Sequence, residues 1–205
     1  MVDAGGIAMS TAAQVVVTAK VQEQINFCVY TGANCAAGGT SITLGDSYGV
    51  LSDAGPFVDK NTHYDISTNA SSGAIIRIKG NTLTSGSNSI TAIGGTATGS
   101  TSGSAQFGLC NYESTGSTLT PQSPYSDSGC SSTTQSAGTN TTGGDGGAKF
   151  AFNTTNTLST YGDEIATDAA GTTATGVIAF IANIPVTQTA GIYTTTLTFI
   201  ATGTY

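Results

Sequence analysis

The sequence contains no tryptophan, a single histidine (His63) and very few charged side chains. Charged residues make up 8% of the chain, against about 25% in an average soluble domain. The five cations are too few and too scattered to neutralise a run of phosphates, so we expect no nucleic-acid partner. No apolar run approaches the ~20 residues of a membrane-spanning helix, so we expect no membrane span.

In place of charge the chain carries small and hydroxylated residues, since Gly, Ser and Thr together account for 87 of its 205 positions. Such a composition suggests disorder, but disordered chains combine low hydrophobicity with high charge. Here 38% of the residues are hydrophobic and charge is scarce. The composition therefore favours a folded chain, and its length allows one domain or two small ones.

Four cysteines, Cys28, Cys35, Cys110 and Cys130, form no CxxC pair, and one histidine cannot complete a Cys/His zinc site. An even count in an acidic, lysine-poor chain favours disulfides and hence an exported protein. The local pairing, Cys28 with Cys35 and Cys110 with Cys130, is favoured because each pair brackets a turn-rich loop, and four reduced thiols are the alternative. Residues 1–3 lack the basic and apolar regions of a signal peptide, so we expect a mature form.

The clearest pattern lies between residues 7 and 21, where apolar side chains alternate with polar ones. The apolar odd positions are Ile7, Met9, Ala13, Val15, Val17, Ala19 and Val21. A period of two predicts a strand with one buried face. Continued to residue 27 it would measure about 65–70 Å at ~3.3 Å per residue, too long for one small sandwich to bury. We therefore expect residues 1–20 to form an N-terminal arm, part of which packs elsewhere.

Further strand patterns recur along the chain, separated by turn residues. They cover residues 41–44, 63–68, 74–79, 89–93, 105–109, 149–152, 177–184 and 192–201. The strands at 63–68 and 74–79 are predicted to form a hairpin, and only residues 163–170 could hold a short helical turn. The sequence thus predicts an all-β, antiparallel β-sandwich (Ig-like or jelly-roll-like), with one domain over 21–205 and a loop-rich insertion near 110–147.

Several segments together resemble a group of exported bacterial β-sandwich surface proteins, which includes pilin-like subunits and the WxL-like and TasA/camelysin-like domains. These segments are Phe27-Cys28 with nearby Cys35, Thr68–Gly73, Gln106–Leu109 and Ala190–Phe199. The closing Gly-x-Tyr-x-x-x-Leu pattern is also similar to the last strand of chaperone–usher fimbrial subunits. The chain lacks the WxL tryptophan and an LPxTG-type sorting signal. The resemblance implies a β-sandwich fold and a cell-surface location.

One short motif suggests catalysis. Gly45–Gly49 matches the G-x-S-x-G nucleophile elbow, which functions only between a strand and a helix. The residues that follow, 50–56, do not begin a helix, so we interpret the motif as a chance match. His63 could be oriented by Asp59 or Asp65, but a histidine at a loop edge is the favoured interpretation. We expect no enzymatic activity and no cofactor.

Acidic residues and sequons offer two further kinds of site. Asp145 lies in a glycine-rich turn, and Asp163, Glu164 and Asp168 could supply the hard oxygen ligands that calcium prefers. A solvated acidic loop is the favoured interpretation of both, so no metal site is predicted. Possible glycosylation sequons begin at Asn69, Asn140 and Asn153.

Self-assembly is the function that the pattern favours most. An extended strand laid against a neighbour's sheet edge gains main-chain hydrogen bonds and buries alternate side chains. Ile7, Met9, Ala13, Val15 and Val17 suit that role, and head-to-tail contacts of this kind propagate into a fibre. The sequence therefore predicts a subunit of an extracellular filament or pilus, whose partners are copies of itself.

Two alternatives remain. Residues 7–21 could be an ordinary edge strand of their own domain. The chain could also be a monomeric adhesin or S-layer module that binds a surface glycan through its 110–147 loops, with Tyr112 and Tyr125 as aromatic contacts.

Overall fold

The computed structural model describes residues 1–2, 4–6, 9–10, 12–114, 116–127, 129–130, 141–142, 147–169 and 173–205. Within these ranges strands dominate and one short helix, α1 (Thr154–Thr157), is present. The strands are β1 (Ile25–Tyr30), β2 (Phe57–Thr68), β3 (Ala74–Lys79), β4 (Thr84–Ser85), β5 (Asn88–Ser89), β6 (Gly94–Gly99), β7 (Gln106–Glu113), β8 (Leu119–Pro121), β9 (Thr141–Thr142), β10 (Lys149–Phe152), β11 (Asp163–Asp168), β12 (Thr173–Asn183) and β13 (Thr198–Gly203).

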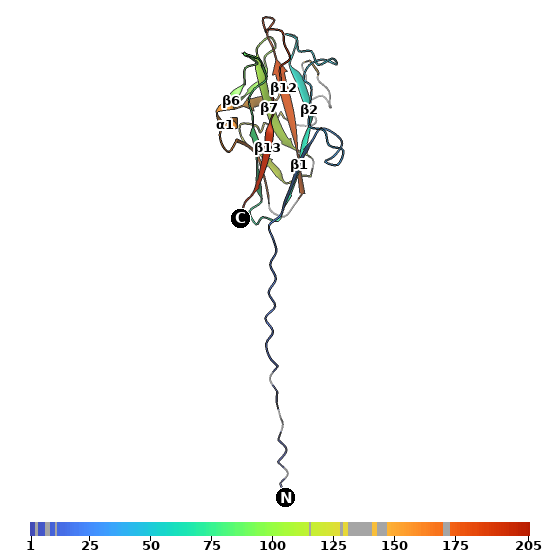
Figure 1. Ribbon diagram of the computed structural model, residues 1–205, viewed down its shortest axis with the longest axis vertical. Helices are drawn as coiled ribbons and strands as arrows, with labels where there is room; N and C mark the ends of the chain where they lie inside the picture. The colour runs from blue at the N-terminus through green and yellow to red at the C-terminus, as the bar shows by residue number, and fades with distance from the viewer. Residues whose placement is uncertain are drawn as a thin grey trace.

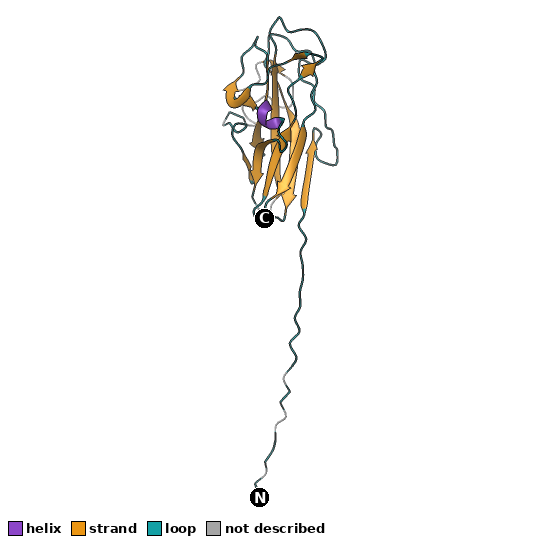
Figure 2. Ribbon diagram, turned by 60° about the vertical axis from the view of Figure 1, so that its left-hand side comes forward, coloured by secondary structure: helices purple, strands orange, loops and turns teal. Residues whose placement is uncertain are grey.

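These strands form two antiparallel sheets that pack against each other, as Figures 1 and 2 show. The larger sheet has the order β1-β2-β12-β7-β10-β6, with β9 beside β2. The smaller has the order β13-β3-β11-β8, and β4 and β5 form a separate ribbon. The predicted all-β, antiparallel sandwich is therefore confirmed.

The core lies between the two sheets because each strand turns its alternate apolar residues inward. Tyr64 and Ile66 of β2 face Ile76 and Ile78 of β3, and all four are buried. A second buried cluster lies apart from this core, centred on β12, β7 and the residues around the second disulfide. It contains Val58, Cys110, Tyr112, Cys130, Ala148, Phe150, Val177, Ala179 and Ile181. With both clusters, β12 is buried along almost its whole length.

The expected hairpin between residues 63–68 and 74–79 is wrong. β2 pairs with β1 and β12, whereas β3 pairs with β13 and β11, so the chain crosses from one sheet to the other between them. Gly73 makes this crossing possible, since its φ is +83° and an added Cβ would meet the Asp168 carbonyl oxygen. Both strands have one apolar face, and alternation alone does not tell which sheet a strand joins.

Other local predictions divide in the same way. Strands stand near the expected places at 63–68, 74–79, 105–109, 149–152 and 177–184. Residues 41–44 form no strand, and residues 192–197 contain only one bridge, between Thr194 and Thr84. The expected 89–93 strand is reduced to the end of β5 and a bridge at Ala92. The helical turn expected at 163–170 is wrong, because Asp163–Asp168 is β11.

Polar side chains connect the two sheets through the core. Asn111 of β7 donates from Nδ2 to the Ile165 carbonyl oxygen of β11 at 2.9 Å and to the Tyr64 hydroxyl at 2.9 Å. The Tyr125 hydroxyl donates to Asp163 Oδ2 at 2.6 Å, and Asn156 Nδ2 donates to Asp163 Oδ1 at 3.1 Å. Both Asp163 oxygens are therefore occupied by protein donors.

The acidic segment at 163–168 was expected to be a solvated loop, and that expectation is wrong. Asp163 and Asp168 are buried in β11, whereas Glu164 points outward to form an ion pair with Arg77 at 3.2 Å. The three carboxylates thus do not converge on one point as calcium ligands would. Asp145 lies outside the described residues.

Asp168 gives the fold a specific pH dependence. Its Oδ1 accepts from Thr118 Oγ1 at 2.8 Å, but its buried Oδ2 has no partner among the described residues. Burial raises the pKa of the Asp168 carboxyl above its ordinary value, against the lowering effect of its hydrogen bonds. The folded state therefore binds this proton more tightly than the unfolded state, and the stabilisation is lost as the pH rises through the raised pKa.

We expect Asp168→Asn to flatten this dependence. Between pH 4 and pH 7 the parent chain should lose about 1 kcal/mol more free energy of unfolding than the variant, since an unpartnered buried polar group costs about 1–3 kcal/mol. Urea unfolding at both pH values measures the difference. Asp53→Asn, in an exposed turn, removes the same charge and is the matched control. Equal slopes for Asp168→Asn and the parent chain would contradict the prediction.

Two disulfides close the described cysteines, Cys28 with Cys35 and Cys110 with Cys130, so the favoured local pairing is confirmed. Disulfides persist in oxidising compartments, and the pair is compatible with an extracellular protein. Among the described residues, no helix is long and apolar enough to cross a membrane.

Candidate assembly site

The N-terminal arm is the most conspicuous feature outside the sandwich. The described residues before Ile25 belong to no helix or strand, and the chain extends away from the body in one direction (Figure 1). Its apolar side chains lie in water, with Met9 91%, Val15 83% and Val17 86% exposed. Ala13 is exposed as well, and Ile7 lies outside the described residues. The arm therefore has the alternation of a strand but pairs with no described strand of its own chain.

The base of the arm is held in line with β1. The Gln24 N–H donates to Asn69 Oδ1 at 2.7 Å, and Asn69 Nδ2 donates to the Gln22 carbonyl oxygen at 2.7 Å. Thr68 Oγ1 donates to the Gln24 carbonyl oxygen at 3.1 Å. These bonds continue the β1–β2 pairing past Ile25 and direct the arm away from the body. The side chain of Asn69, a sequon residue, is thus engaged at the arm base.

Two sheet edges face each other on one side of the sandwich. β1 ends the larger sheet and pairs only with β2, and β13 ends the smaller sheet and pairs only with β3. The two edge strands approach each other near the arm base, where the C-terminus also lies (Figure 1). Unpaired edges offer rows of N–H and C=O groups to an added strand.

A groove of about 1200 Å³ occupies the space between these edges. Its floor contains Phe27 and Val29 of β1 with Phe107 and Phe180 from the core. Its rims are residues 40–51 on one side and residues 188–197 on the other. None of the described lining residues is charged. The groove therefore suits an uncharged apolar occupant.

The groove is an unfilled part of the core and not a separate cavity. Phe107 and Phe180, which reach its floor, are buried in the main cluster. The apolar residues above them are only partly buried. They include Phe27, Val29, Ile42, Leu44, Leu51, Leu83, Tyr193, Leu197 and Phe199. A sandwich in which one side of the core stays half open lacks one strand at that place.

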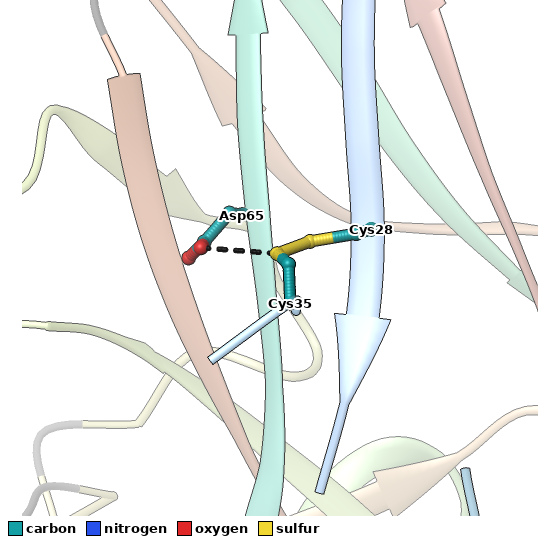
Figure 3. A group of neighbouring side chains, drawn as sticks. All are labelled: Cys28, Cys35 and Asp65. Atoms are coloured by element: carbon teal, nitrogen blue, oxygen red, sulfur yellow. Dashed lines mark hydrogen bonds between the residues drawn. A yellow bond between two sulfur atoms is a disulfide. The ribbon is translucent and has the colours of Figure 1, made fainter. Parts of the chain in front are cut away.

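The opposite face of β1 carries a small polar group around Asp65, shown in Figure 3. Asp65 Oδ1 accepts from the Thr175 hydroxyl at 2.8 Å and from the Tyr30 hydroxyl at 3.2 Å. Asp65 Oδ2 lies 3.3 Å from Cys35 Sγ. A disulfide sulfur carries no hydrogen, so this last approach is a contact without a donor. Cys28, Cys35 and Asp65 are close enough to suggest a metal site, but the disulfide leaves no thiolate to bind one.

His63 completes this face by stacking on Tyr30, with ring centroids 5.4 Å apart. Burial lowers the pKa of His63, and nearby Asp65 and Asp59 only partly offset this. Burial and the neighbouring Asp65 both raise the pKa of Tyr30. We interpret the group as a fastening for the 31–39 loop, because its polar atoms are directed at one another.

The remaining sequence candidates lie elsewhere. The G-x-S-x-G segment is a turn in which Asp46 Oδ1 accepts from the Tyr48 and Val50 amides at 2.8 and 3.0 Å. It is neither preceded by a strand nor followed by a helix, so it lacks the geometry of a nucleophile elbow. Among the sequons, Asn153 precedes α1 and is partly buried, and Asn140 lies outside the described residues.

The aromatic contacts expected for a glycan-binding module are not at the surface. Tyr125 is 0% and Tyr112 9% exposed. Tyr125 is held by Asp163, and Tyr112 belongs to the second buried cluster. Neither ring can stack on a sugar in this structure, so that part of the prediction is wrong.

The groove itself was missed by the sequence prediction, although its two walls carry visible signals. The odd apolar face of the arm continues into Phe27 and Val29, and Tyr193, Leu197 and Phe199 share one face near the C-terminus. Nothing in either pattern shows that the two segments flank one opening. No family model, curated protein or solved structure matches the chain.

Proposed function

We propose that the chain is a structural subunit of an extracellular filament or pilus, assembled by insertion of each N-terminal arm into a neighbouring subunit. One observation carries the proposal: the same chain has an exposed, strand-patterned apolar arm and an unfilled apolar groove between two free sheet edges. Each feature exposes surface that a soluble monomer would normally bury. Copies of the chain can cover both at once.

The energetics support assembly over an isolated monomer. Each of Met9, Val15 and Val17 would contribute roughly 1.5–3 kcal/mol if fully removed from water. An inserted strand would also satisfy main-chain groups on both edges, which otherwise invite unspecific aggregation. Because every copy offers one arm and one groove, the contacts are head-to-tail and do not close.

An extracellular location fits the two disulfides and the composition of the surface. A surface dominated by Thr, Ser and Gly offers trypsin-like proteases few cleavage sites, since the chain has only five Lys and Arg residues. The net charge of −7 opposes unspecific precipitation of subunits. The resemblance to pilin-like surface subunits seen in the sequence favours the same location.

Size-exclusion chromatography and negative-stain imaging of the purified full chain test the proposal. We expect polymers that elute near the void volume and appear as fibres of uniform width. A monodisperse monomer at high concentration and physiological salt, with no fibres on the grid, would contradict the proposed function and favour a monomeric surface module.

A further inference from the structure

We infer that residues 12–18 of a second copy's arm fill the groove as a strand that runs antiparallel to β13 and parallel to β1. The inference rests on the proposed filament function and deepens it, because it names the acceptor, the inserted segment and the direction of insertion. Ala13, Val15 and Val17 then face the core, and Gln14, Val16 and Thr18 face solvent.

The chemistry of arm and groove agrees. Residues 4–19 carry no charge, and the described residues that line the groove carry none either. Asp3, Lys20 and Glu23 lie outside that uncharged stretch, so they would stay clear of the apolar floor. The segment is also long enough. From the level of Ile66, opposite Phe27, to Phe57 the groove wall rises over roughly 30 Å at ~3.3 Å per residue, a length that nine or so extended residues fill.

The arm of the same copy is directed away from its own groove. Gln22 and Gln24 are fixed to Asn69 beyond the end of β1, so the arm leaves the body in the direction opposite to that in which β1 runs (Figure 1). To enter its own groove the arm would have to break these bonds and turn back. A second copy needs no such turn.

The direction of insertion follows from where the groove lies. Its lining starts at Phe27 and Phe199 and continues to Ile184, just past the end of β12 farthest from the arm. A neighbour stacked on that far end in the same orientation sends its arm down into the groove with the N-terminus leading. The inserted chain then runs from the arm end toward the far end, as β1 does, and opposite to β13. An arm folded back into its own groove would have the reverse polarity.

The wall formed by residues 192–199 shows which side chains would face each other. Tyr193, Thr195, Leu197 and Phe199 are partly buried, and the alternate residues Thr194, Thr196 and Thr198 are exposed. In an antiparallel pair, residues directly opposite each other point to the same face. The exposed wall residues would therefore lie beside the solvent-facing arm residues Ser10, Gln14 and Thr18.

Cysteine pairs on this exposed face test the inference without disturbing the core. Six double variants combine Ser10→Cys, Gln14→Cys or Thr18→Cys with Thr194→Cys or Thr198→Cys in the full chain. After mild oxidation, non-reducing gel electrophoresis separates intermolecular ladders from internally linked monomers. All five positions are exposed polar residues, and the native cysteines are already paired, so the variants should fold as the parent chain does.

We expect ladders from two variants whose residue numbers have the same sum, either 10/198 with 14/194 or 14/198 with 18/194. Matched pairs should give about tenfold more ladder than the others, because a disulfide needs Cα atoms within ~7 Å. Pairs with a constant difference, 10/194 with 14/198 or 14/194 with 18/198, would mean parallel pairing with β13 and would overturn the inference. Internally linked monomers would overturn it too.

Two further outcomes separate this inference from the proposed function. Fibres that form normally but give no ladder from any pair would leave the filament function standing and show that the arm binds elsewhere. If neither fibres nor ladders form, the inference and the filament function fail together.

Discussion

Deletion of residues 1–17 should abolish polymers and leave a folded, soluble monomer. The deletion removes the exposed apolar positions Met9, Val15 and Val17 but no residue of either buried cluster. Gln22 and Gln24 remain to pair with Asn69, so the start of β1 is preserved. Size-exclusion chromatography and negative-stain imaging should show the change from fibre to monomer, and circular dichroism should retain the β signal of the parent chain.

Two neighbouring valines supply the matched control. Val15 and Val16 are 83% and 87% exposed in the arm and differ only in the face they present. Val15→Lys would bury an unpaired ammonium in the groove, which costs several kcal/mol and should raise the concentration needed for polymerisation about a hundredfold. Val16→Lys places the same charge toward solvent and should leave that concentration within a few-fold of the parent value.

Fibres that persist without residues 1–17 would show that the arm is not the assembly element. Equal effects of the two lysine substitutions would contradict a strand with one buried face. Either result would require another surface to hold the subunits together, and the exposed Val186 and Ile192 at the far end of the body would be examined next.

Replacement of Cys110 and Cys130 by alanine should cost about 3 kcal/mol of unfolding free energy, because the bond closes a loop with a sequence separation of 20. Both residues are buried, at 0% and 3% exposure, beside Phe150 and Val177 in the second cluster. For a chain of this length the loss corresponds to a decrease in Tm of roughly 6–12 °C. Urea and thermal unfolding of the arm-deleted chain, without reductant, measure the change free of polymerisation.

Replacement of Cys28 and Cys35 is the matched control. That bond closes a shorter loop, with a sequence separation of 7, and its cysteines belong to neither buried cluster. The chain-entropy argument gives a smaller loss, about 2 kcal/mol. A larger loss from this pair than from Cys110 and Cys130 would mean that the 31–39 loop, held near Asp65, supports the sandwich more than its exposure suggests.

Several properties of this protein could be predicted from the sequence because they depend on neighbouring residues. Alternation identified the strands at 63–68 and 149–152 and the strand character of the arm, since side chains of a strand point to opposite faces in turn. The turn-rich loops between the cysteines indicated the local disulfides. Scarce charge with ample apolar residues indicated a packed all-β body.

Other properties were decided only by the tertiary structure. Alternation gives the buried face of β2 and β3 but not the sheet that each joins, so the expected hairpin was wrong. Asp163 and Asp168 look like loop carboxylates until Tyr125, Asn156 and Thr118 are brought to them from distant segments. The groove depends on the convergence of β1 and β13 from opposite ends of the chain, and a local pattern contains no record of which segments become neighbours.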